Sequence, residues 1–330
     1  MPEQQLDLFG QPVDVFKNAL ERYGVWPITV WPMNHQDATK QKLQALIGDD
    51  PNGSYSSIEG GPRVYQSERV QPRGGQQGGD TPTSPKPSRA NAGTMSYHRM
   101  GLTTGLGSSQ HSSDGGANTH TSIFNPAVAA WLLNCYAPKV GVCLDPFAGG
   151  GTRAILAAKH GLKYVGLEIR AEEVAALRGR IDAAGVAGSC TIHQADARQI
   201  AAYKPGDYLL TCPPYWNLEQ YQGGAADLSM APTYKTFLQG VGEVVQATHK
   251  ALYPGAYSCW VVGLHRQANG ELLPLNHDIA HLHRESGFMF CEEIILHHQN
   301  NGAIQRVGNF EKGRHHLVRV HEYALVFRRQ

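Results

Sequence analysis

The sequence predicts an α/β domain with a mainly parallel β-sheet over residues 119–330. Short apolar runs of strand length alternate there with longer segments of helical periodicity. A glycine-rich turn, "DPFAGGGT", directly follows the first of these runs. Such alternation favours parallel strands connected by helices that cover both faces of the sheet.

The apolar patterns, and the residues that end them, give the order of the elements. Gly161 and Gly185 close two helical segments, as glycine commonly does at helix C-termini. The predicted helices span 125–137, 152–161, 171–185, 234–252 and 275–287. The predicted strands span 140–147, 163–169, 190–196, 206–216 and 256–263, and residues 290–299 and 321–329 are expected to form an antiparallel pair.

The first 118 residues differ in composition from the rest of the chain. Residues 1–50 are predicted to form an N-terminal extension, with helices over 14–24 and 37–50 and an extended segment over 25–31. Residues 51–118 are rich in Gly, Ser, Pro, Gln and Thr and have too little apolar surface to offset their ordering entropy. They predict a flexible linker or insertion. Because their basic residues outnumber their acidic ones, ordering on a polyanionic partner is the alternative.

The overall composition is that of a soluble protein with a sizeable core. Hydrophobic residues make up 41% of the 330 residues, and the formal net charge of +1 neither indicates nor excludes a nucleic-acid partner. The six cysteines form no CxxC pattern, which predicts reduced thiols in a cytoplasmic protein and no metal site. The N-terminus lacks signal-peptide features and no stretch is long enough to span a membrane, so no membrane association is expected.

Acidic side chains lie at the ends of three successive predicted strands, where ligands bind in a parallel sheet. Asp145 begins the glycine turn, whose glycines let the backbone approach a ligand and whose following helix favours an anionic group. Glu168 is suited to accept both hydroxyls of a ribose, and Asp196 could accept from the amine of adenine. Together they predict an adenosine-bearing cofactor. The sequence has no phosphate-loop motif, which argues against a nucleoside triphosphatase.

Two motifs in this order resemble those of a known enzyme family. "DPFAGGGT" and the later "CPPYW" resemble motifs I and IV of the S-adenosylmethionine-dependent amino-methyltransferases of DNA, and "HTSIFNPAVAAWLL" resembles motif X, which precedes them. The resemblance covers residues 119–330 and is greatest to orphan enzymes of phage and prophage type. It implies a Rossmann-like methyltransferase fold, S-adenosylmethionine as cofactor, and double-stranded DNA with a base flipped out as partner. The resemblance leaves open whether a cognate restriction enzyme exists.

The resemblance also implies which residues form the site. The cofactor set is Ser122, Phe124, Asp145, Phe147, Gly149, Gly151, Thr152, Glu168 and Asp196, and the catalytic set is Cys212, Pro213, Pro214 and Tyr215. Rigid prolines would fix a backbone carbonyl of Cys212 or Pro213 as acceptor for an amine hydrogen. Tyr215 would offer a face on which the flipped base stacks. Trp216, Asn217, Glu219 and Tyr221 follow on the same loop and are expected either to shape the base pocket or to pack the loop.

Position 212 departs from the family pattern, because the family has Asp, Asn or Ser where this chain has Cys212. A thiol is a poor hydrogen-bond acceptor, so the backbone carbonyl would carry more of the task. Cys212 could also be read as the nucleophile of a cytosine-C5 enzyme, but those enzymes have a Pro-Cys step and this chain has Cys-Pro-Pro-Tyr. Adenine N6 and cytosine N4 both remain open as targets.

The residues that recognise the substrate are not evident from a separate domain. Candidates are the first 118 residues, the loop over 217–235, and the basic segment "QNNGAIQRVGNFEKGRHHLVRVH", which could contact phosphates. Two alternatives to a DNA enzyme remain. One is an RNA or protein-glutamine N-methyltransferase, and the other is a non-catalytic nucleic-acid-binding protein with the same fold.

Overall fold

The computed structural model describes residues 30–33, 124–221, 223–267, 269–298, 317 and 319–330. The strands of the main sheet are β1 (Val30–Met33), β2 (Val142–Asp145), β3 (Lys163–Glu168), β4 (Cys190–Gln194), β5 (Gly206–Thr211), β6 (Leu252–Val262), β9 (Phe288–His298) and β10 (His321–Arg329). The α-helices are α3 (Pro126–Tyr136), α4 (Thr152–His160), α5 (Ala171–Ala183), α6 (Tyr234–Ala251) and α7 (Leu275–Glu285). Short 3-10 helices are η2 (Ala187–Ser189), η3 (Ala197–Ala202), η4 (Trp216–Leu218) and η5 (Leu228–Met230).

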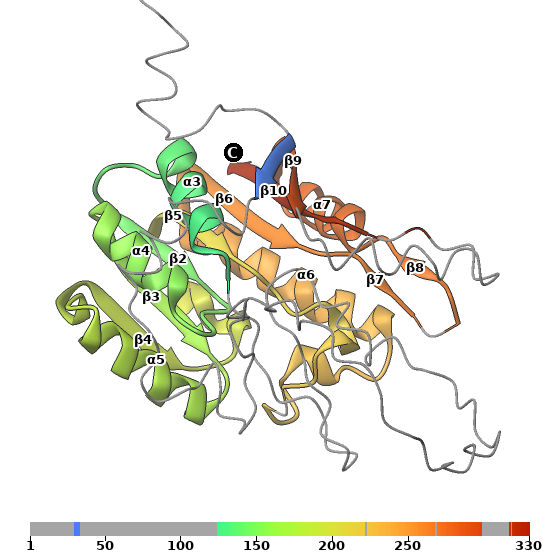
Figure 1. Ribbon diagram of the computed structural model, residues 1–330, viewed down its shortest axis with the longest axis horizontal. Coiled ribbons are helices and arrows are strands. Elements are labelled where there is room, and N and C mark those ends of the chain that lie inside the picture. The colour runs from blue at the N-terminus through green and yellow to red at the C-terminus, as the bar shows by residue number, and fades with distance from the viewer. Residues whose placement is uncertain (1–29, 34–123, 222, 268, 299–316, 318) are drawn as a thin grey trace, which may run out of the picture.

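The eight-stranded sheet has the order β1-β9-β10-β6-β5-β2-β3-β4. Strands β4, β3, β2, β5 and β6 run parallel to one another, whereas β10 lies antiparallel between β6 and β9. Figure 1 shows β4 with α5 at one end of the sheet and β1, in blue, beside β9 at the other. The predicted α/β class, the mainly parallel sheet and the C-terminal antiparallel pair are therefore confirmed.

The chain reverses its direction of winding between β2 and β5. From β2 it moves outward through β3 to β4, and it then returns to add β5 and β6 on the other side of β2. In open parallel sheets such a switch point leaves a crevice outside the carboxyl ends of the two strands. The topology therefore places a ligand site beyond Asp145 and Thr211, the last residues of β2 and β5.

Alternate residues of the central strands pack into two separate cores, as the two-residue repeat of a strand requires. On β2, Cys143 belongs to the core that includes Leu132 of α3 and Ile155 of α4. Leu144 belongs to the opposite core, which includes Phe237 of α6. The central strands are thus covered on both faces, which explains why their sequences are apolar throughout.

Some elements were not predicted from the sequence. Strand β1 lies partly within the predicted extended segment at 25–31, but its parallel pairing with β9 joins the N-terminal extension to the sheet edge. A small antiparallel hairpin of β7 (His265–Arg266) and β8 (Leu272–Leu273) was missed, because its strands have only two residues each. The helices predicted over 14–24 and 37–50 and the linker predicted over 51–118 lie outside the described residues. Within the described part, no helix is both long and apolar enough to cross a membrane.

The core around α7 contains a buried histidine. The ring of His283 stacks on Phe327 with ring centres 3.7 Å apart, and it makes a T-shaped contact with Trp260. Its Nδ1 donates to the carbonyl oxygen of Ile279, and Nε2 has no partner among the described residues. Burial therefore lowers the pKa of His283 to about 3, because a second proton would be enclosed without a partner.

We expect His283 to make the fold acid-sensitive. In the unfolded chain this histidine is protonated below pH 6.5, whereas in the folded chain it is protonated only near pH 3. The free energy of unfolding therefore decreases as the pH is lowered from 6.5 towards 3. When the pH is lowered from 7 to 5, the free energy of unfolding of His283→Phe should decrease by about 2 kcal/mol less than that of the natural chain. Urea unfolding at both pH values measures the difference. Equal losses in the two proteins would contradict this account.

Candidate functional site

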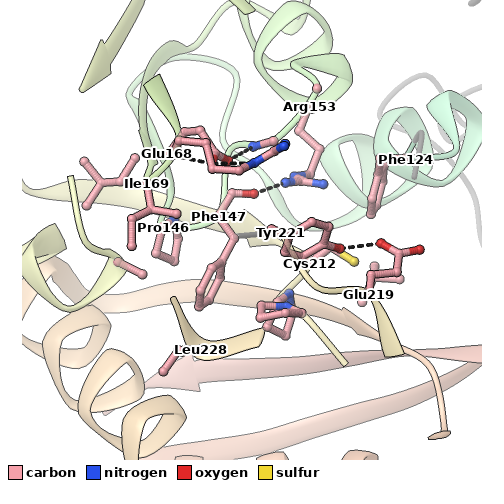
Figure 2. Close-up of a pocket in the computed structure, with 18 of the residues that line it drawn as sticks. Phe124, Pro146, Phe147, Arg153, Glu168, Ile169, Cys212, Glu219, Tyr221 and Leu228 are labelled. Atoms are coloured by element: carbon pink, nitrogen blue, oxygen red, sulfur yellow. Dashed lines mark hydrogen bonds and ion pairs between the residues drawn. The ribbon is translucent and has the colours of Figure 1, made fainter. Parts of the chain in front are cut away.

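A pocket opens beyond the carboxyl ends of β2, β3, β4 and β5, at the switch point of the sheet. One part is lined by the glycine turn, by Glu168 and by Asp196, and another by the Cys212–Tyr215 loop. Pro146, Phe147, Ile169 and Leu228 contribute apolar walls. Figure 2 shows these side chains converging on the pocket from different elements. The fold thus brings into one cavity the motifs that are separated by about sixty residues in the sequence.

The glycine turn owes its shape to backbone conformations that other residues disfavour. Gly149 has φ +48° and Gly151 has φ +88°, both in the left-handed region. A Cβ at position 151 would lie 2.2 Å from Cδ1 of Leu177, so α5 packs directly against the turn. Helix α4 begins at Thr152, and its positive N-terminal end therefore faces the pocket.

Asp145 lies beneath the pocket rather than in its lining, and its side chain is fully buried. Its Oδ2 accepts from Nε of Arg153 at 2.6 Å and from the hydroxyl of Tyr164 at 2.8 Å. Its Oδ1 accepts from the hydroxyl of Thr211 at 2.7 Å and from the backbone N–H of Phe147 at 3.1 Å. Four donors therefore saturate this carboxylate, which suits it to hold the site together.

Glu168 does line the pocket and is held by the backbone around it. Its two oxygens accept from the N–H of Gly149 at 3.1 Å and from the N–H of Arg170 at 3.0 Å. Burial raises the pKa of Glu168, and the nearby Arg170 guanidinium opposes that rise. The carboxylate is thus fixed at the mouth of the glycine turn, where each oxygen retains a second lone pair.

Asp196 lies on the pocket wall at the start of η3. It caps this short helix by accepting from the N–H of Arg198, and it also pairs with the Arg198 guanidinium at 2.6 Å. Arg198 is in turn bound by Glu243 of α6 at 2.7 Å. The position of Asp196 therefore depends on the helix that packs behind it.

The start of α3 forms another wall. The Phe124 ring lies 4.7 Å from Cζ of Arg153, a cation–π contact that connects α3 to α4. Arg153 also donates to the carbonyl oxygen of Phe147, as Figure 2 shows. Arg153 was not singled out in the sequence, although it directly follows Thr152. The predicted site residue Ser122 lies outside the described residues.

The Cys212–Tyr215 loop leaves β5 and is fixed at both ends. Pro213 and Pro214 are buried, and the Tyr215 hydroxyl donates to Oε1 of Glu322 on β10 at 3.2 Å. The Cys212 sulfur lies 3.5 Å from the same hydroxyl oxygen. Since that hydroxyl gives its proton to Glu322, the thiol is the donor to Tyr215. Burial raises the pKa of Cys212 to about 12, so the thiol stays protonated at neutral pH.

The residues after this loop divide between pocket and core. Glu219 and Tyr221 line the pocket, and the Tyr221 hydroxyl donates to Oε2 of Glu219. Trp216 does not line it: its indole N–H donates to the carbonyl of Ala231 at 2.9 Å and its ring packs against Tyr234. Trp216 also has φ +55°, the left-handed conformation that among the described non-glycine residues it alone adopts. The indole therefore packs the loop, whereas the sequence left open a place in the base pocket.

Glu322 was not predicted as a site residue. It lines the pocket with a side chain that is almost fully buried. Its segment, "HEYALVF", is marked only by an acid within an otherwise apolar strand. This pattern is the signal that could have identified Glu322, because an acid is seldom buried without a partner or a function.

Comparisons with known proteins agree with this geometry in part. Residues 12–178, slightly more than half of the chain, match the N6/N4 family described as DNA methylase. The matched range includes Phe124, the glycine turn and Glu168, and ends before Cys212. The type II methyltransferase M.ScaI of Streptomyces caespitosus is 39% identical over 64 residues, which are 19% of this chain. The match spans 21% of that relative's length.

Solved structures with a similar course include methyltransferases and related proteins. TrmN from Thermus thermophilus has 16% identity and a TM-score of 0.43, with 63% of this chain and 49% of that chain covered. A methyltransferase from Pyrococcus furiosus has 15% identity and a TM-score of 0.42, with 68% and 89% covered. At TM-scores this low the superpositions decide nothing, and the strand order carries the fold assignment.

The four bonds to Asp145 predict that this residue acts on stability. Asp145→Asn should lower the free energy of unfolding by about 3–5 kcal/mol, because Arg153 would be left buried without its counter-charge and the new amide group would face other donors. Chemical denaturation measures the change. The exposed Asp182→Asn on α5 is the matched control and should change it by less than about 0.5 kcal/mol. A loss below about 1 kcal/mol for Asp145→Asn would contradict the assigned role.

Proposed function

The chain belongs to the N6/N4 DNA methylase family, and from this premise we propose that it transfers a methyl group from S-adenosylmethionine to an exocyclic amine of adenine or cytosine in DNA. Its sheet has the order of a Rossmann-like methyltransferase fold. The observation that carries the proposal is a continuous pocket at the switch point, which joins the glycine turn and Glu168 to the Cys212–Tyr215 loop. One part suits a cofactor and the other a base.

The first part of the pocket fits S-adenosylmethionine, which supplies an activated methyl group when bound. Glu168 is fixed by two backbone N–H groups and keeps lone pairs for the ribose hydroxyls. Asp196 lies on the same wall and can accept from the adenine amine. The N-terminal end of α4 favours the negative charge of the methionine carboxylate. Phe147, Ile169 and Leu228 offer the apolar surface that an adenine ring requires.

The second part suits an amine acceptor that needs no covalent enzyme intermediate. The buried prolines fix the backbone after β5, so a carbonyl of Cys212 or Pro213 can orient an amine hydrogen of a flipped base. Tyr215 lines this part, and its bond to Glu322 fixes the ring on which the base would stack. The raised pKa of Cys212 leaves a thiol rather than a thiolate, which opposes the cytosine-C5 reading. The family match favours DNA over RNA or protein glutamine.

We further propose how the chain divides. Residues 119–330 would form the catalytic domain, and the N-terminal extension would contribute its edge strand β1 to that domain. Residues 51–118 would connect them. Sequence recognition is expected from residues 1–118, from the loop over 217–235 or from the basic segment that precedes β10.

Glu168 should determine cofactor affinity without determining stability. Glu168→Gln should weaken S-adenosylmethionine binding about 10–100-fold, because hydrogen bonds to a carboxylate contribute about 1.5–3 kcal/mol. Isothermal titration calorimetry measures this affinity. Glu172→Gln, at an exposed position in the first turn of α5, is the matched control and should bind normally. Equal affinities for the two variants would remove Glu168 from the cofactor site.

The proposed reaction is tested by transfer of labelled methyl from S-adenosylmethionine to unmodified duplex DNA, followed by mass spectrometry of the nucleosides. N6-methyladenine or N4-methylcytosine should accumulate, and the product identifies the base. Duplex RNA and denatured protein serve as competing acceptors. Bound cofactor with label in neither DNA base would refute the proposed activity.

A further inference from the structure

Two acidic side chains lie near the Cys212–Tyr215 loop, which has no acidic residue of its own. Position 212 carries a thiol, but Glu219 and Glu322 reach the same part of the pocket from a loop and from β10. Their hydrogen bonds differ. Glu322 is engaged by the hydroxyl of Tyr215, whereas Glu219 uses only Oε2, which accepts from Tyr221. No described residue donates to Oε1 of Glu219, although this side chain lines the cavity.

We propose that Glu219 is a catalytic residue whose Oε1 accepts a hydrogen of the target amine and takes up the proton that the amine releases. This role rests on the proposed function and extends it. The side-chain acceptor that the family pattern has at position 212, as Asp, Asn or Ser, would here be supplied from seven positions later in the chain, by Glu219. Tyr221 would hold the other carboxylate oxygen and so fix the direction of Oε1.

The bonds and charges in this step balance. The amine nitrogen forms a bond to the methyl carbon as the carbon–sulfur bond of the donor breaks, and the electron pair of that bond stays on sulfur. The methylated nitrogen then carries the positive charge and gives one proton to the Glu219 carboxylate. Glu219 returns this proton to water when the pocket opens, and the carboxylate is restored.

The surroundings of Glu219 suit this task. Glu219 faces Tyr221 on its own loop, Tyr215 on the preceding turn, Glu322 on β10 and Arg170 at the start of α5. Burial and, to a smaller extent, the Glu322 charge raise the pKa of Glu219, Tyr221 and Arg170 oppose the rise, and the resulting pKa is about 7. A base whose pKa lies near the working pH is efficient in proton transfer. In Figure 2 the pair of Glu219 and Tyr221 lies beside the Cys212 sulfur, where the base is expected.

A purely structural role for Glu219 would predict different behaviour. In a purely structural role the Tyr221 bond would shape the loop, and the amide oxygen of a glutamine could still accept that bond. Glu219→Gln therefore separates the two roles, because it keeps the shape and the acceptor of the side chain but removes its basicity.

The test measures single-turnover methyl transfer from S-adenosylmethionine to duplex DNA across pH 5.5–9. The natural chain should gain activity as pH rises through about 7, because Glu219 must be ionised to accept the proton. Glu219→Gln should be about 10²–10⁴-fold slower and should lose this rise, with unchanged affinity for the cofactor. The exposed Glu285→Gln at the end of α7 is the matched control and should behave as the natural chain.

Tyr221→Phe tests the same role with Glu219 intact. Removal of the Tyr221 hydroxyl takes away a bond that lowers the pKa of Glu219, so the rise in activity should move to higher pH. A structural role predicts no such movement.

Thermal unfolding gives a readout that is independent of catalysis. Glu219 has a folded pKa of about 7 and an unfolded value near 4.5, so its ionisation opposes folding above pH 7 and has no effect below pH 4.5. Glu219→Gln should therefore raise the Tm at pH 8 and leave it nearly unchanged at pH 4.5. A lower Tm at pH 8 would show that the ionised side chain serves stability and would overturn the proposal.

The outcomes distinguish this inference from the function on which it rests. A natural chain that binds cofactor but methylates no DNA overturns the proposed function, and the role of Glu219 falls with it. A natural chain that methylates DNA while Glu219→Gln does so equally well overturns the role of Glu219 alone. A slow variant that keeps the rise near pH 7 also overturns it, since another group would then be the base.

Discussion

The site depends on one buried carboxylate. Asp145 ends β2, and its bonds reach Arg153 on α4, Tyr164 on β3 and Thr211 on β5. Thr211 directly precedes the Cys212 loop, and Arg153 directly follows the start of α4, so the two parts of the pocket are aligned through the same side chain. A buried charge is tolerable only when it is paired and fully hydrogen-bonded, and Asp145 meets both conditions. The positions of the groups that bond to Asp145 are therefore closely constrained.

A second constraint comes from β10, the strand that runs antiparallel to both of its neighbours. Because β10 lies antiparallel between β6 and β9, its beginning reaches the same edge of the sheet as the end of β5. Glu322, the second residue of β10, can therefore accept a hydrogen bond from the Tyr215 hydroxyl. A fully parallel sheet would carry the start of this strand to the opposite edge. The antiparallel insertion thus connects the last element of the chain to the motif at its centre.

The strands and helices could be predicted from the sequence because each depends on its own periodic pattern and on local stops such as Gly161. The pocket could be predicted because parallel strands deliver their ends to one edge. The role of Asp145 could not, since its donors come from three elements whose register only the folded sheet sets. The site role of Glu322 and the pairing of β1 with β9 were missed for the same reason, because both depend on contacts between distant segments.

The same geometry explains why a neutral residue is compatible with position 212. Burial does most to raise the pKa of Cys212, the Arg153 guanidinium opposes the rise, and the Glu322 and Asp145 carboxylates add to it. An acid at this position would be buried beside two other carboxylates, with the neighbouring Arg153 guanidinium already paired to Asp145. A protonated thiol avoids that conflict and donates to Tyr215, which in turn holds Glu322. With Asp145 and Glu322 both engaged in structure, Glu219 is the acid near Cys212 with an oxygen to which no described residue donates.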